Sequence, residues 1–199
     1  MIRGAVVAGA AMLVLGAAPG FAHPHVFIDY TATILCDGDK VTGVRIAWTF
    51  DEMYSASLYH DYTSRPHGPL SPQDVQQLEA GAFEDTAEEH YFTDIAVDGK
   101  PQTVSAVKDF DASYDGRRMT YRFTAPLSLA AGVQPTILEV DSFDTEFYID
   151  YELLKHDAIK VENGAALKIV CAPKKASKVT TTFGPLDTQI VACTFQRAA

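Results

Sequence analysis

The segment VFIDYTATILC (residues 26–36) is followed by DGDK (residues 37–40) and then by VTGVRIAWTF (residues 41–50). The first and third segments are rich in β-branched and aromatic residues with partial alternation, which is typical of strands. The four residues between them favour a tight turn. We therefore predict a β-hairpin over residues 26–50, and the remaining segments are expected to pack around it.

Two helices are predicted directly after the hairpin. Residues 51–61 have helical character. Ser71-Pro72-Gln73-Asp74 is a strong helix start, with Ser as the N-cap and Pro at the first helical position. Apolar residues along one face extend this second helix to about Glu89. The helical pair is therefore inserted at about residues 51–89.

From Tyr91 onward the chain returns to short strands. Asp98-Gly99, Asp115-Gly116 and Asn163-Gly164 are dipeptides that suit tight hairpin turns. Residues 173–187 contain several lysines and prolines and favour an exposed loop. We therefore expect an α+β, β-rich fold: an antiparallel β-sandwich-like domain with an inserted helical pair.

Three cysteines allow one intramolecular disulfide bond and one remaining thiol. Cys171 and Cys193 lie in segments of strand character, residues 166–172 and 188–195, which can pair. We predict a disulfide bond between these two cysteines. Cys36, beside the turn, is expected to be a small buried apolar residue. Because the sequence contains no CxxC spacing, a thiolate zinc site is not expected.

Residues 1–22 have the plan of a cleavable secretion signal. Arg3 supplies a positive start, residues 5–18 form an apolar run, and small residues precede a cleavage point after Ala22. The apolar run is too short to span a membrane. We therefore expect an exported protein whose mature chain, residues 23–199, is a single domain without an integral membrane segment.

The charge of the chain narrows the range of its partners. The formal net charge is −10 and the isoelectric point is about 4.9. Nucleic acids and anionic membrane surfaces attract basic proteins, so neither is an expected partner. An acidic surface attracts cations, although it also serves solubility.

Cleavage after Ala22 would leave His23-Pro24-His25 at the mature N-terminus. In an extended strand, residues two apart face the same side, so the two imidazoles would project together with Cα atoms about 6.5 Å apart. Pro24 has no amide proton, which excludes chelation through a deprotonated second amide. The remaining chelate uses the amine and imidazole of His23 together with the imidazole of His25.

The predicted hairpin supplies a further ligand. If Asp37 and Lys40 close a two-residue loop, Glu52 lies opposite His25, and a one-residue bulge substitutes Asp51. Nitrogen ligands with a carboxylate suit Zn, Ni, Co or Cu(II), whereas calcium and magnesium prefer oxygen ligands. We therefore predict a metal site formed by His23, His25 and either Glu52 or Asp51. The alternative is that the two histidines only begin a solvated strand.

Three motifs resemble a known family. They are His23-Pro24-His25-Val26-Phe27-Ile28-Asp29, then Trp48-Thr49-Phe50-Asp51-Glu52 with Ser55, then Tyr91-Phe92-Thr93 leading to Val97-Asp98-Gly99-Lys100. In combination they resemble a bacterial family of domains of unknown function, number 1007 in that series. The resemblance implies a periplasmic component of an ABC-type transport system, encoded near transporters of the nickel and cobalt type.

The loop between the helices departs from the family pattern. Many relatives carry an acidic loop of the EF-hand kind there, but residues 63–74 keep only its scaffold. The first, third and fifth ligand positions hold Thr63, Arg65 and His67, which cannot supply the carboxylates that calcium needs. We expect no calcium site there, and His67 is at most a secondary metal contact.

Three functions follow from these observations. The leading one is a non-enzymatic, periplasmic accessory protein that captures Zn, Ni, Co or Cu and presents it to a membrane metal transporter. The first alternative is a copper-dependent oxidative enzyme with an N-terminal histidine site. The second is a metal-free partner-binding β-domain that uses the acids and aromatics of residues 141–151, although Asp141, Asp144 and Glu146 also suit solvated turns.

Overall fold

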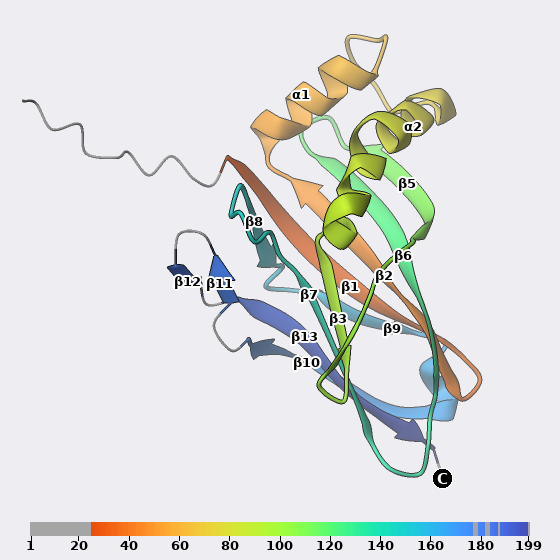
Figure 1. The fold of residues 1–199 in the computed structure, drawn as a ribbon. Coiled ribbons are helices and arrows are strands. Elements are labelled where there is room, and N and C mark those ends of the chain that lie inside the picture. Colours follow the sequence, from red (N-terminus) through yellow and green to blue (C-terminus); the bar gives the residue numbers. More distant parts are fainter. Residues whose placement is uncertain (1–24, 177–178, 182–183, 187, 199) are drawn as a thin grey trace, which may run out of the picture.

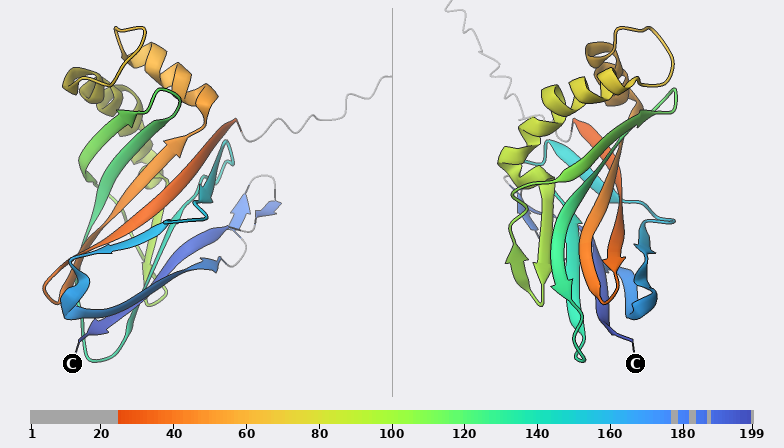
Figure 2. Two further views of the ribbon diagram at one scale, coloured as in Figure 1. Left: turned by 180° about the vertical axis from the view of Figure 1, so that it is seen from behind. Right: turned by 90° about the vertical axis from the view of Figure 1, so that its right-hand side faces the viewer.

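A computed structural model describes residues 25–176, 179–181, 184–186 and 188–198. The predicted secretion signal, residues 1–22, and His23 lie outside these residues. The described chain forms two β-sheets packed face to face, with helices at one end (Figures 1 and 2). The β-rich, sandwich-like α+β fold expected from the sequence is therefore confirmed.

The first sheet is built on the predicted hairpin of β1 (Val26–Asp37) and β2 (Lys40–Phe50). Its strand order is β5-β6-β2-β1-β8, and β9 also pairs with β1. The added strands are β5 (Lys108–Tyr114), β6 (Met119–Ala130), β8 (Ile149–Leu153) and β9 (Ile159–Glu162). β8 and β9 run parallel to β1, unlike the antiparallel pairs expected from the turn signals. The chain crosses from β7 in the second sheet to the edge of the first sheet and then runs along β1 as β8 and β9 in turn.

The second sheet has the order β10-β13-β7-β3-β4. Its strands are β3 (Thr93–Val97), β4 (Lys100–Gln102), β7 (Thr136–Ser142), β10 (Leu167–Lys175) and β13 (Gln189–Arg197). The predicted pairing of the two cysteine-containing segments is present, and Cys171 is disulfide-bonded to Cys193 directly opposite.

The prediction of an exposed loop over residues 173–187 is wrong in part. β10 continues to Lys175, and β11 (Val179–Thr181) pairs with β12 (Gly184–Leu186). Lysines and prolines do not end β10 because it is an edge strand, where a missing amide proton and exposed charges are tolerated.

The helical insertion begins as predicted but ends differently. Asp51 caps α1 (Glu52–Tyr62), and Ser71 forms a capping box with Asp74 at the start of α2 (Pro72–Leu78). The second helix does not continue regularly to Glu89. A π-helical turn, η1 (Glu79–Phe83), and a 3-10 segment, η2 (Glu84–Phe92), follow it. A further 3-10 turn, η3 (Gly164–Ala166), precedes β10.

Gly81 lies within the π-helical turn, where α1 comes close. The Tyr62 hydroxyl donates to the Gly81 carbonyl at 2.5 Å, and a Cβ atom at position 81 would lie 2.6 Å from the Tyr62 ring. Only glycine allows α1 and the second helical segment to approach this closely.

The core lies between the sheets and beneath the helices. Trp48 is its centre, with ring centroids 4.7 Å from Phe123, 5.4 Å from Tyr151 and 6.1 Å from Phe83. These rings come from β6, β8 and the helical insertion, so Trp48 joins the sheet to the helices. Cys36 is buried and unpaired, which confirms its predicted role as a small apolar residue.

The disulfide bond is expected to stabilise the fold through the chain that it closes. Cys171 and Cys193 are 22 residues apart, so their replacement by alanine should lower the free energy of unfolding by about 3 kcal/mol. Urea unfolding of the wild type with and without dithiothreitol measures this loss. The double variant should be insensitive to dithiothreitol, and equal stability of the oxidised and reduced wild type would contradict the prediction.

Candidate functional site

The candidate site is the end of the first hairpin where β1 begins. Near the turn, Cys36 pairs with Val41, but Leu35 pairs with Gly43, so a bulge at Thr42 shifts the register by one residue. Ile28 consequently lies opposite Phe50. The simple register that placed Glu52 opposite His25 is therefore wrong. The bulge also shifts the pairing in the direction opposite to the one that would bring Asp51 beside His25.

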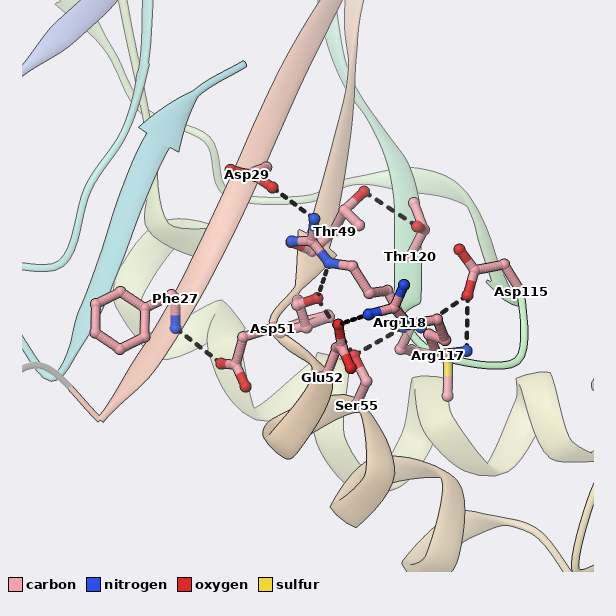
Figure 3. A network of polar contacts seen from close by, with 12 residues as sticks. Phe27, Asp29, Thr49, Asp51, Glu52, Ser55, Asp115, Arg117, Arg118 and Thr120 are labelled. Carbon is pink, nitrogen blue, oxygen red and sulfur yellow. Dashed lines mark hydrogen bonds and ion pairs between the residues drawn. The ribbon is translucent and has the colours of Figure 1, made fainter. Parts of the chain in front are cut away.

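Asp51 lies opposite Phe27 and joins three elements. Its backbone N–H donates to the Phe27 carbonyl at 2.8 Å. One carboxylate oxygen accepts from the Phe27 N–H at 3.1 Å (Figure 3). The other accepts from the Tyr54 N–H at 2.9 Å. Asp51 thereby ends β2, caps α1 and fixes the first residues of β1.

Glu52 points away from β1. Its carboxylate forms an exposed ion pair with Arg117, in the turn between β5 and β6 (Figure 3). In this turn the Asp115 carboxylate accepts the N–H groups of Arg117 and Arg118, each at 2.8 Å. These hydrogen bonds lower the pKa of Asp115. The turn is thus held in a shape that directs both arginines toward the hairpin.

Arg118 closes the end of the hairpin. Its guanidinium donates to the carbonyls of Phe50 at 2.6 Å and Thr49 at 2.7 Å, and it pairs with Asp29 at 2.6 Å (Figure 3). The Asp29 side chain is engaged in this ion pair, which ties β1 to the turn between β5 and β6. Ser55 adds a buried link by accepting from the Met119 N–H at 2.8 Å.

His25 lies at the exposed start of β1. Its N–H donates to the Tyr148 carbonyl at 2.9 Å, and the ring centroids of the two side chains are 4.9 Å apart. Asp144 fixes this loop, because its carboxylate accepts the N–H groups of Glu146, Tyr148 and Ile149, each at 2.9 Å. Since Asp144 is only 5% exposed, its interpretation as a solvated turn residue is wrong.

The described part of the chain does not bring all four predicted metal ligands together. Asp51 and Glu52 have the partners given above, and His23 lies outside the described residues. Within those residues, no group of three or more His, Cys, Asp or Glu side chains is arranged to hold a metal ion.

The loop between the helices is tied by its own residues. Arg65 pairs with Asp74 at 2.8 Å, and the Ser71 N–H and hydroxyl both donate to the same carboxylate at 2.7 Å. The Ser71 hydrogen bonds lower the pKa of Asp74. His67 lines a surface pocket of about 530 Å³ beside His60, at the far end of α1.

A second cluster lies on the outer side of the second sheet. Asp141 stands opposite Asp94 across β7 and β3, beside a pocket of about 350 Å³. The Tyr30 hydroxyl donates to the Gln189 carbonyl at 2.7 Å and lies 3.3 Å from Asp141, and Thr188 donates to Asp141 at 3.2 Å. Burial and the carboxylate of Asp94 raise the pKa of Asp141 to about 7. Asp141 is therefore a half-buried strand residue and not a solvated turn residue.

Comparison with known proteins assigns the chain to a family. Residues 8–190 match the family described as "Protein of unknown function (DUF1007)". The chain belongs to the DUF1007 family. The resemblance predicted from the three motifs is therefore confirmed, and the match covers the hairpin, the helical insertion and most of the strands.

Two relatives of this DUF1007 chain are uncharacterized proteins. One, from Haemophilus influenzae, is 25% identical over 130 residues, which are 64% of this chain and 61% of that protein. The other, a 15.5 kDa protein in the trpE 3′ region of Spirochaeta aurantia, is 29% identical over 106 residues, which are 52% of this chain and 75% of that protein. The chain thus spans less than two thirds of the Haemophilus protein's length.

One solved structure with a similar course of the chain is the type 1 acetylcholine-binding protein of Biomphalaria glabrata. It shares 10% sequence identity with a TM-score of 0.41, over 87% of this chain and 85% of that one.

No helix in the described part of the DUF1007 chain has the length and apolar character needed to cross a membrane.

Arg118 should contribute far more stability than its neighbour Arg117. Arg118→Ala removes an ion pair and two hydrogen bonds to the carbonyls at the end of β2, so we expect a loss of about 2–3 kcal/mol in the free energy of unfolding. Arg117→Ala breaks an exposed pair and should cost at most about 1 kcal/mol. Urea unfolding compares the two variants, and equal losses would contradict the role given to Arg118.

Asp141 should make stability depend on pH. Its folded pKa, about 7, lies above the unfolded value of about 3.9, so the folded state binds more protons between these limits. Stability should therefore fall by about 1–3 kcal/mol as the pH rises from 4 to 7, and then level off. Thermal unfolding across this range measures the fall.

Two variants isolate this effect. Asp141→Asn should flatten the pH dependence, whereas Glu139→Gln, on the same face of β7 and paired with Lys174, should leave it unchanged. If Asp141→Asn and the wild type give parallel curves, another group carries the proton.

Proposed function

We propose that the chain is an exported, non-enzymatic accessory protein that binds a divalent transition-metal ion, Zn, Ni, Co or Cu, through His23 and His25. In this proposal the protein acts in the periplasm and presents the ion to a membrane metal transporter. The observation that carries the proposal is the exposed position of His25 at the start of β1, on a backbone held by the Tyr148 carbonyl.

The geometry of His25 supports a metal-binding role. Its backbone is anchored on one side by β8 and the preceding loop, which in turn depend on the buried Asp144 carboxylate. A fixed backbone limits the entropy lost when the imidazole binds an ion. Extension of β1 by two residues would bring the His23 imidazole to the same face.

The carboxylates have different parts in this proposal. Each oxygen of Asp51 accepts one backbone N–H, so part of its acceptor capacity remains for a cation. Glu52 would have to leave Arg117 first. The histidines are therefore the primary ligands, and Asp51 mainly positions the strand that carries them.

The surroundings of His25 suit contact with a partner. Phe27, two residues along the same face, is 51% exposed, and Tyr148 is 49% exposed. Exposed aromatic residues beside a labile ion give a partner protein apolar area to bury. Export is supported by the disulfide bond, which is compatible with an oxidising compartment. The transporter as partner rests on the family resemblance.

Metal titration of the mature protein tests the proposal. Protein recovered from the periplasm, with its N-terminus identified by mass spectrometry, should bind one Zn(II), Ni(II), Co(II) or Cu(II) ion in calorimetric titration. His23→Ala and His25→Ala should each lose most of the affinity, because each removes a nitrogen ligand. His60→Ala, an exposed histidine on α1, is the matched control and should bind like the wild type.

Two results would contradict the proposed metal-binding function. Binding by His23→Ala at wild-type affinity would exclude the N-terminal site. A wild-type protein whose melting temperature does not change with any of these ions would favour a metal-free, partner-binding domain.

A further inference from the structure

A small cavity lies between the first sheet and the helical insertion. Its volume is about 50 Å³, and its walls come from β1, β2, β6 and β8 on one side and from α1, η1 and η2 on the other. Trp48, Phe50 and Phe92 are among the rings that line it. It lies on the inner side of the sheet, so it is separate from the surface around His25.

Two tyrosines that line this cavity have buried hydroxyl groups without a partner in the part of the chain that the structure describes. Tyr121 is only 3% exposed, and the hydroxyl oxygens of Tyr121 and Tyr151 are both buried. Neither makes a hydrogen bond to any described residue. A buried hydroxyl without a partner destabilises the fold, so two of them beside one cavity indicate that a bound molecule supplies the hydrogen bonds.

The residues that line the cavity favour an uncharged ligand. None of the described residues around the cavity is charged. Burial raises the pKa of Tyr121 and of Tyr151 far above the usual value, so both phenols stay neutral. Neither an anion nor a cation would find an opposite charge here, and burying an unpaired charge is costly.

We propose that this cavity binds a small neutral molecule with an apolar body and a hydroxyl group, held by Tyr121 and Tyr151. A hydroxyl both donates and accepts, as the two phenols do. The volume of the cavity narrows the ligand class further, because about 50 Å³ is a third of the roughly 150 Å³ of an engineered cavity that binds benzene. The ligand is therefore a short-chain alcohol and not an aromatic compound.

The wall formed by η2 is the one that moves during exchange. The strands are held by sheet hydrogen bonds, whereas 3-10 segments have poorer hydrogen-bond geometry. His90, Tyr91 and Phe92 have positive φ angles of 52°, 55° and 41°, which are unfavourable for residues other than glycine. Phe92 lines the cavity, so this turn is the part of the wall best suited to open when a ligand enters.

Trp48 provides a direct test because it is the only tryptophan of the chain and lines the cavity. We expect ethanol to shift the NMR signal of its indole N–H saturably, with a dissociation constant in the millimolar range or weaker. Acetate and methylammonium, of similar size but charged, should give no saturable shift.

Variants then assign the site. The double variant Tyr121→Phe/Tyr151→Phe keeps both rings and should weaken ethanol binding at least about tenfold, the factor that follows from losing one hydrogen bond to the ligand. Tyr114→Phe, outside the cavity, should bind like the wild type. Circular dichroism and melting temperatures establish that each variant folds.

Three results would overturn the proposal. The first is a linear shift that is the same in every variant. The second is saturable binding of acetate that equals binding of ethanol. The third is that no alcohol binds to the wild type up to molar concentrations while the double variant melts at a lower temperature than the wild type. The two hydroxyls would then be hydrogen-bonded to water only.

Discussion

The fold depends on a conflict of register inside the first hairpin. The turn pairs Asp37 with Lys40, and continuing this register would place even-numbered residues of β1 opposite odd-numbered residues of β2. The core needs even-numbered residues from both strands. These are Val26, Ile28, Tyr30, Ala32 and Ile34 on β1 and Val44, Ile46, Trp48 and Phe50 on β2. Opposed side chains share a face, so only an extra residue, Thr42, reconciles the turn with the core.

This register separates two kinds of chemistry along β1. Phe27 faces outward between Asp51, which directly follows β2, and Asp150 on β8, whereas Ile28 faces inward beside Tyr151. The outer face thus carries charged residues, among them Asp29 in its ion pair with Arg118, and the inner face is neutral and aromatic. Without the bulge, Arg45 and Thr49 would turn toward the core and Trp48 toward solvent, at a cost of several kcal/mol for the buried charge alone.

Local signals of the sequence predicted the first hairpin, the cap of the second helix and the disulfide bond. Ser71 followed by Pro72 and Asp74 is sufficient for a helix start, because capping depends on residues close in sequence. The bulge was also predictable, since the parity of the apolar residues demands it. The simple hairpin register failed because it considered only the turn.

Other features have no local signal. Arg118 closes the hairpin from 68 residues away in sequence, and Asp144 supports His25 from a different part of the chain. The close approach of Tyr62 to Gly81, within the π-helical turn, is a tertiary contact between residues of two different helical segments. Raised pKa values, such as that of Asp141, arise from burial, and an alternating pattern alone does not reveal the depth of burial.

Asp51 connects the outer and inner sides of the molecule. One oxygen holds Phe27 on the outer face, and the other holds the N–H of Tyr54, whose ring lines the inner cavity. Direct coordination of a metal ion would use the acceptor capacity that the two N–H groups leave, but a shift of the carboxylate toward the ion would weaken the helix cap, whose loss costs about 1 kcal/mol. If Asp51 supports the metal site only indirectly, no hydrogen bond is lost, because its two hydrogen bonds orient β1 while the imidazoles bind the ion. Asp51 is therefore better placed as the joint between the strand and the helical insertion than as a metal ligand.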